Sequence, residues 1–231
     1  MSQHIKNAVT IIGIAIRSFY KKISKHLFSG EGTKYLKHFD VRSTLIKQTI
    51  KVVANEGFDK TTTKAIVGDT GINEAYIYKF FKDKDDLLTA TFSALDEELC
   101  SKTLYYVSVM NMPDMDFEMR CQFFFTAIWQ FLLGNRDKCI TYVRYYNSPY
   151  FRKYSSDEHK QRYVPLVNKC SAAFRDGANT WMILHHILET MLGFAIKIFN
   201  EELENNEDTA KHVFILVYGT VCSYRAEGHA C

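Results

Sequence analysis

The chain consists of long stretches with helical hydrophobic periodicity, separated by short polar breaks, and no stretch shows the alternation of a strand. Apolar residues recur at spacings of three and four, the pattern of one face of an α-helix. Near the N-terminus this pattern predicts a helix over about 3–28, with a basic opposite face and an apolar stripe formed by Ile5, Val9, Ile12, Ile16, Phe19 and Ile23. Residues 29–32, Ser-Gly-Glu-Gly, then predict a short linker.

Helical periodicity continues to the C-terminus. A second predicted helix covers 41–54, and the stretch 62–87 holds two short helical patterns on either side of Gly71. Beyond them the pattern predicts six longer helices, at 84–109, 115–134, 136–148, 157–175, 179–204 and 208–225. The sequence therefore predicts an all-α protein.

Composition agrees with this fold class. The 231 residues are 47% hydrophobic, enough for one or two substantial cores, and include only three prolines and eleven glycines. So few turn-forming residues favour long helices over the short strands of a sandwich or barrel. The six cysteines lie far apart, without the close spacing of zinc ligands or of a small disulfide framework. This spacing favours a reducing, cytoplasmic location.

An apolar run at residues 8–16 raises the question of targeting. The run is too short to span a membrane. Arg17, Lys21, Lys22 and Lys25 follow it, where a signal peptide would carry small residues at its cleavage site. We therefore expect no membrane span, and the run is a poor match to a signal peptide.

Charge is distributed unevenly along the chain. Residues 1–88 carry fifteen Lys and Arg against nine Asp and Glu, a net charge of +6, whereas the remaining residues carry fourteen against seventeen, a net charge of −3. A polyanion is attracted to the positive N-terminal part through release of its counterions. The acidic remainder offers phosphates no such attraction.

The stretch around Gly71 has the residue pattern of a helix-turn-helix. Thr62 is suited to cap a helix that runs to about Thr70, because its hydroxyl can accept a hydrogen bond from an exposed amide. Gly71 can adopt the left-handed conformation of a tight turn, and Asn73 can cap the second helix. The residues expected to face inward are Ile66, Val67, Ile72, Ile77, Phe80 and Phe81.

The second helix of the motif is expected to present polar and aromatic side chains outward. Its spacing leaves Glu74, Ala75, Tyr76, Tyr78 and Lys79 on or near the exposed side. On a helix that enters the major groove, hydroxyl and ammonium groups meet phosphates and base edges. The sequence therefore predicts that this helix contacts DNA.

The motif resembles the DNA-binding domain of the TetR family of bacterial transcriptional regulators. These segments follow the family pattern in order and spacing, without a gap: Glu56-Gly57-Phe58, Thr61-Thr62, Ile66, Gly71-Ile72-Asn73, Ile77-Tyr78-Lys79-Phe80-Phe81 and Lys82-Asp83-Lys84-Asp85-Asp86-Leu87. The remainder of the chain agrees with the family in length and helical character only. The resemblance implies a ligand-responsive repressor, neither an enzyme nor cofactor-dependent, that binds a palindromic double-stranded DNA operator as a homodimer.

The resemblance also implies a division of the chain into three parts. Residues 1–40 form a basic amphipathic N-terminal extension, residues 41–88 a three-helix DNA-binding domain, and residues 89–231 a helical ligand-binding and dimerisation domain. Three interpretations of the extension stay open. It packs on the protein or is partly disordered, it adds an arm on DNA phosphates, or it contacts a membrane surface or another protein.

By the same resemblance, Thr62 contacts a phosphate, and Ala75 and Tyr76 lie over bases. Glu74 departs from the family pattern, and it either accepts a hydrogen bond from a cytosine amino group or points away from DNA. Backbone contacts are implied for Tyr78, Lys79 and the linking-helix residue Lys84. The predicted DNA-binding set is Thr62, Asn73, Glu74, Ala75, Tyr76, Tyr78, Lys79 and Lys84.

The region from 123 to 154 is rich in aromatic residues. Most of them suit a hydrophobic core, and some can line an inducer cavity in which tyrosine hydroxyls orient a ligand. Tyr106, Trp129 and Tyr145 are the candidates. The expected effector is an apolar or aromatic small molecule of unknown identity.

A dimer is expected because one recognition helix contacts too few base pairs to be selective. The resemblance implies that the last two helices pair with their symmetry mates in a four-helix bundle. The apolar residues predicted for this interface are Leu188, Leu192, Ala195, Ile196, Phe199, Phe214, Val217 and Val221, with Gly219 nearby.

Two other function classes fit the sequence less well. An enzyme would have to use His185, His186 and Glu189, but no nucleophile elbow, phosphate loop or second ligand cluster accompanies them. A His–Glu pair on a helix surface is favoured over a metal site. The second alternative is a helical interaction protein that keeps a helix-turn-helix scaffold without binding DNA.

Overall fold

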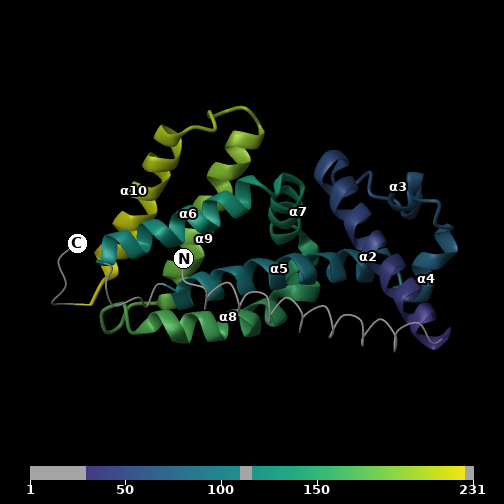
Figure 1. The fold of residues 1–231 in the computed structure, drawn as a ribbon, viewed down its shortest axis with the longest axis horizontal. Coiled ribbons are helices and arrows are strands. Elements are labelled where there is room, and N and C mark those ends of the chain that lie inside the picture. The colour runs from purple at the N-terminus through teal and green to yellow at the C-terminus, as the bar shows by residue number, and fades with distance from the viewer. Residues whose placement is uncertain (1–29, 110–115, 227–231) are drawn as a thin grey trace, which may run out of the picture. The chain divides into compact units, whose positions relative to one another are not determined.

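The computed structural model describes residues 30–109 and 116–226, and the regular elements among them are helical (Figure 1). The predicted all-α fold class is therefore confirmed. In chain order the elements are α2 (Gly30–Glu56), α3 (Thr63–Val67), η1 (Gly68–Thr70), η2 (Glu74–Tyr76), α4 (Ile77–Phe80), α5 (Lys84–Val109), α6 (Phe117–Leu133), α7 (Arg136–Tyr146), η3 (Phe151–Ser155), α8 (Ser156–Ser171), α9 (Thr180–Phe199) and α10 (Glu207–Tyr224). Of the short elements, η1 and η2 are 3-10 turns and η3 is a π turn.

The six predicted long helices are all present, with ends that differ by a few residues. The predicted linker at 29–32 is wrong, because α2 already begins at Gly30 and continues to Glu56. Residues 33–40 contain no glycine or proline that would interrupt a helix, so the helical hydrogen bonds extend back across them. The predicted helix at 3–28 lies outside the described residues.

The chain divides into two compact units, Met1–Leu45 and Ile46–Cys231. All contacts described below lie within the second unit. In that unit α5 packs against α6, α7 and α8, and α9 packs against α6, α7, α8 and α10. The buried apolar residues of α9 recur at helical spacing, with Ile183, Ile187, Met191 and Ala195 at intervals of four. Helix α9 is therefore a central element of the C-terminal core.

Of the helices that the structure describes, α9 is long and apolar enough to cross a membrane by length and composition alone. Its contacts with four neighbouring helices explain the same composition. A helix that packs against partners on several sides needs apolar residues around most of its circumference.

Helix α7 joins the C-terminal core to the helix-turn-helix region. The hydroxyl of Thr141 donates to the backbone carbonyl of Ile50, at 2.9 Å, and the guanidinium of Arg144 donates to that of Val53. The hydroxyl of Tyr145 lies 3.0 Å from Thr89 Oγ1 near the start of α5. One helix thus holds both α2 and the N-terminal part of α5.

A buried polar network joins α5, α7 and α8. The carboxylate of Asp96, which is fully buried, accepts hydrogen bonds from Tyr142 Oη at 3.1 Å, from His159 Nδ1 at 2.9 Å and from Arg162 Nη1. Arg162 also pairs with Glu158 on its own helix. A buried carboxylate with this many donors is compensated in charge, and it ties three helices to one point.

Candidate nucleic-acid interface and ligand cavity

The turn of the motif has the predicted local geometry. The hydroxyl of Thr62 accepts from Ala65 N at 3.0 Å, and Asn73 Oδ1 accepts from Ala75 N at 2.9 Å. Gly71 has φ +70° and ψ 5°, in the left-handed region. The two predicted caps and the predicted left-handed glycine are confirmed, because each residue meets a local backbone requirement.

The first motif helix is shorter than predicted. Helix α3 ends at Val67, and Gly68, with φ +24°, begins the turn η1. Glycine lowers helix stability and tolerates this positive φ. The hydroxyl of Thr70 then donates to Val67 O and accepts from Ile72 N. These two hydrogen bonds stabilise the turn, so that the α-helix does not continue beyond Val67.

Buried residues fix the orientation of the second motif helix, which consists of η2 followed by α4. Ile77 is fully buried, and Phe81 and Ile66 are buried with it, as the spacing predicts. Ile72 and Phe80 are only half-buried. Because the inward residues are held in the core, the opposite face is held outward.

That outward face carries the residues predicted to contact DNA. Tyr76 and Tyr78 are 41% and 59% exposed, although large apolar groups are usually covered. Ala75 and Lys79 are also exposed. The ammonium of Lys79 lies 4.1 Å from the ring centroid of Tyr76, so a cation–π contact holds the two side chains together.

The remaining predicted DNA-binding residues lie around this face. Thr62 and Asn73 are exposed caps, and Lys84 is half-buried at the first position of α5. The carboxylate of Glu74 accepts a hydrogen bond from the hydroxyl of Thr63. Glu74 therefore contacts the preceding helix of the motif.

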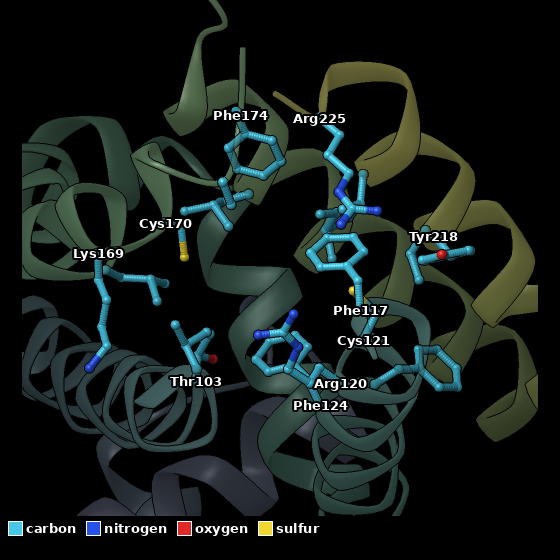
Figure 2. Close-up of a pocket in the computed structure, with 18 of the residues that line it drawn as sticks. Thr103, Phe117, Arg120, Cys121, Phe124, Lys169, Cys170, Phe174, Tyr218 and Arg225 are labelled. Atoms are coloured by element: carbon cyan, nitrogen blue, oxygen red, sulfur yellow. The ribbon is translucent and has the colours of Figure 1, made fainter. Parts of the chain in front are cut away.

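An apolar cavity of about 340 Å³ lies among α5, α6, α8, α9 and α10 (Figure 2). Its walls include Phe125, Leu166, Ile187 and Met191. Three cationic side chains also line it, and none of the described lining residues is Asp or Glu. These cations are Arg120, Lys169 and Arg225. The cavity is therefore apolar with a positive charge.

The cations lie on two sides of the cavity, with Arg120 and Arg225 near Phe117 and Lys169 across from them (Figure 2). The guanidinium carbons of Arg120 and Arg225 lie 5.9 Å and 3.7 Å from the ring centroid of Phe117. The ammonium of Lys169 donates to Ser108 Oγ at 2.6 Å. Burial raises the pKa of the lining thiol Cys121 to about 11, so that thiol adds no negative charge at neutral pH.

None of the three predicted effector residues is on this lining. Tyr145 is buried and hydrogen-bonded to Thr89 and Ser155. Trp129 is buried behind Phe125, with 5.7 Å between the ring centroids. Tyr106 is half-buried and meets the ring of Phe123 edge-on.

The predicted dimer residues fall into two groups. Five are buried within the protomer, and three are half-buried. The buried ones are Leu188, Leu192, Ala195, Phe214 and Val217, and the half-buried ones are Ile196, Phe199 and Val221. The large hydrophobic residues that are exposed on these two helices are Met182 on α9 and Ile215, Leu216 and Tyr224 on α10. Gly193 and Gly219 are also exposed, with open space where a Cβ would lie.

His185 and Glu189 form a helix-surface pair, with 3.3 Å between Nε2 and Oε1. His185 also contacts the hydroxyl of Tyr146. Across residues 30–109 and 116–226, the structure brings together no group of three or more metal-ligating side chains.

Residues 45–91 match the sequence model of the family described as bacterial regulatory proteins, tetR family. They form a TetR-family helix-turn-helix. The resemblance that the motif suggested is thereby confirmed. A comparison with curated protein sequences gave no match.

The TetR-family fold extends over most of the chain. The structure of a TetR family transcription regulator from Marinobacter aquaeolei VT8 has a TM-score of 0.65 at 15% identity, covering 78% of this chain and 94% of that one. The structure of a putative TetR family transcription regulator from Shewanella sp. PV-4 has a TM-score of 0.61 at 14% identity, covering 77% of this chain and 96% of that one. The fatty acid degradation regulator FadR from Bacillus halodurans has a TM-score of 0.56 at 17% identity, and the match covers 76% of this chain and 93% of that one.

Proposed function

We propose that the protein is a TetR-type transcriptional repressor that binds a palindromic operator as a homodimer and responds to a small-molecule effector in the cytoplasm. The observation that carries this proposal is the exposed face of η2 and α4. Tyr76, Tyr78 and Lys79 are solvent-exposed there, on a helix whose other side is held by buried Ile77. Two exposed tyrosines beside a lysine offer hydrogen bonds and positive charge to a DNA backbone.

Thr62, Asn73, Ala75 and Lys84 extend this interface. The hydroxyl of Thr62 still has a proton to donate to a phosphate after it accepts from Ala65 N. For Glu74 the hydrogen bond with Thr63 favours an orientation toward α3 over a contact with a base. We propose that Glu74 positions the second motif helix against the first.

Selection of bound sequences from random DNA duplexes tests the function. We expect enrichment of a palindrome whose half-sites are centred about one helical turn, or a small multiple of it, apart. A single enriched half-site would contradict dimeric binding. Absence of any enrichment would favour the alternative, a helical interaction protein that does not bind DNA.

The proposed dimer interface is the exposed face of α9 and α10. Met182, Ile215 and Leu216 are at least half exposed, and exposed apolar side chains favour burial against a partner. Gly193 and Gly219 leave open space beside them, which allows two helices to approach closely. Leu188 and Phe214, which were also predicted for the interface, are buried inside the protomer and line the apolar cavity.

Replacement of Ile215 and Leu216 by glutamate is expected to convert the dimer to a monomer. Two carboxylates desolvated at a symmetric interface, and duplicated in the partner, cost more than the interface gains. Sedimentation equilibrium measures the mass directly. The control is Val164→Glu, an exposed apolar residue on α8 that is 43% exposed. A dimer that persists in the double variant would show that the interface lies on another part of the surface.

The apolar cavity is the proposed effector site. Its volume of about 340 Å³ lies within the range of small-molecule pockets. Arg120 and Lys169 favour an effector with an acidic group on an apolar body. The regulation of fatty acid degradation by the Bacillus halodurans relative accords with such a molecule. Release of the selected duplex by acidic amphiphiles, compared with their alcohols, tests this preference.

The proposed mechanism is a population shift. An effector bound among the central helices favours arrangements in which the two recognition helices are wrongly spaced for successive major grooves. Helix α7 supports this mechanism, because Thr141 and Arg144 bond directly to backbone carbonyls of α2. The mechanism needs neither catalysis nor a cofactor.

A further inference from the structure

The outward face of the second motif helix carries only a few side chains. The helix spans Glu74–Phe80, as η2 followed by α4, and its inward residue Ile77 is fully buried. The exposed residues of this short helix are Glu74, Ala75, Tyr76, Tyr78 and Lys79. In a helix-turn-helix the N-terminal residues of the second helix contact base edges in the major groove, whereas the first helix crosses the DNA backbone. On the proposed function, the operator sequence is therefore recognised mainly by Glu74, Ala75 and Tyr76.

The side chains that usually recognise purines are few in the motif. Guanine is recognised by a bidentate arginine or lysine, and adenine by a bidentate asparagine or glutamine. Residues 56–88, which contain the whole motif, include no arginine and no glutamine. The one asparagine among them, Asn73, accepts from Ala75 N through its side-chain oxygen, at 2.9 Å. Because that oxygen caps the helix, Asn73 cannot also form the bidentate contact with adenine.

Two charged groups of the outward face already interact with neighbouring side chains. The carboxylate of Glu74 accepts from the hydroxyl of Thr63, and the ammonium of Lys79 lies 4.1 Å from the ring centroid of Tyr76. A glutamate would recognise the amino group of cytosine, and a lysine the acceptors of guanine. Both interactions within the protein therefore compete with recognition of a G·C pair.

The rest of the base-contacting surface is apolar. It consists of the methyl group of Ala75, which is exposed, and the ring of Tyr76, which is 41% exposed. The C5-methyl of thymine is the apolar group that the bases present in the major groove. Contact with an exposed apolar surface removes that methyl from water, which is favourable. The hydroxyl of Tyr76 can donate and accept, so it suits any base and adds little selectivity.

We propose that the protein recognises its operator through thymine methyl groups, with T·A pairs opposite Ala75 and Tyr76 in each half-site. The thymine methyl packs against Ala75 Cβ and the ring of Tyr76. These two residues determine specificity, while Tyr78 and Lys79 supply backbone contacts that are common to all sequences. The inference rests on the proposed function and adds the chemistry by which the operator is selected.

Replacement of thymine by uracil in the selected duplex tests the proposal, because deoxyuridine pairs like thymidine and lacks only the C5-methyl. Burial of one methyl group accounts for about fourfold in affinity, so replacement at the contacted position of both half-sites should weaken binding by about fifteenfold. Thymines elsewhere in the duplex should be replaceable without effect. At the contacted position 5-methylcytosine should bind several-fold more tightly than cytosine, because it restores the same methyl group. Anisotropy titration at fixed salt measures each affinity.

Ala75→Gly identifies the protein group that contacts the methyl. In this variant the ratio of thymine to uracil affinity should fall from about fifteen to less than about four. A ratio measured within one variant does not depend on its folded fraction, so the lower helix stability of glycine does not enter. The matched control is Ala94→Gly, an exposed alanine on α5, which should keep the full ratio.

Equal affinity for the thymine and uracil duplexes at every position would overturn the proposal, and so would a selected half-site of invariant G·C pairs. Both results leave the proposed function in place, because an operator is then still bound. An unchanged ratio in Ala75→Gly would overturn the role of Ala75. Duplex selection that enriches no sequence would instead overturn the proposed function, and this inference with it.

Discussion

Simultaneous replacement of Tyr78 and Lys79 by alanine is expected to lower affinity for the selected operator by about a hundredfold at about 0.1 M salt. Both side chains are exposed on the outward face of α4. Removal of a charge-assisted hydrogen bond to phosphate and of a tyrosine hydrogen bond, in each of two subunits, accounts for this size. Electrophoretic mobility shift or anisotropy titration measures it.

The salt dependence of binding separates a direct phosphate interaction from a structural effect. Removal of a lysine that touches phosphate should make the slope of log K against log salt shallower by about one for each phosphate that is no longer neutralised. The matched control is Lys102→Ala with Tyr105→Ala, an exposed lysine and a 62% exposed tyrosine on α5. Unchanged operator affinity in the Tyr78 and Lys79 variant would exclude this face from the interface.

The helix-turn-helix was predictable because its signals are local. Thr62, Gly71 and Asn73 each satisfy a requirement of the backbone within three residues of their own position. The apolar spacing of Ile66, Ile77 and Phe81 then determines which side is buried. Neither argument depends on the distant part of the chain, so tertiary context could not overturn it.

The apolar cavity was not predictable from aromatic density. Core and cavity walls have the same composition, and Tyr145 and Trp129 were equally suited to either. Basic residues such as Arg120 and Lys169 on amphipathic helices resemble ordinary solvent-facing positions. Their approach to one cavity depends on how α6 packs relative to α8, which periodicity does not contain.

The dimer face presents the same difficulty in another form. Periodicity shows which residues of α9 and α10 are apolar, but not which apolar stripe the protomer itself covers. Leu192 and Phe214 turn inward, while Ile215, the next residue along α10, is left exposed. A helix with apolar residues on two sides has two candidate interfaces, and only the packed protomer distinguishes them.

The sequence also holds a signal for the buried polar network. The buried positions of α5 include Phe92, Leu95, Leu99 and Cys100, and Asp96 lies on the same face. A carboxylate on the apolar stripe of a helix must find donors on its neighbours. His159 and Arg162 supply such donors, and because they are three residues apart on α8, both lie on one face of that helix.

Replacement of Asp96 by alanine is expected to lower the free energy of unfolding by about 3–5 kcal/mol, the range for breaking a buried ion pair from one side. The substitution removes the acceptor of the His159 ring and one of the acceptors of the partly buried guanidinium of Arg162, which keeps its contact with Glu158. For a chain of this length that corresponds to a fall in melting temperature of roughly 10 °C. Thermal and urea unfolding followed by circular dichroism measure both quantities. Glu97→Ala, one residue along α5 and exposed, is the control and should change stability by less than about 0.5 kcal/mol.

A compensated variant separates the two reasons why Asp96→Ala would be unstable. If the cost arises from uncompensated donors, Asp96→Leu combined with Arg162→Met and His159→Phe should recover most of the missing stability, because of the three groups that donate to Asp96 only the hydroxyl of Tyr142 is then left without its acceptor. If the cost arises from the smaller side-chain volume, Asp96→Leu alone should recover it. Equal instability of the single and triple variants would show that the network is required for the packing of α5 against α8, and not only for its own charge balance.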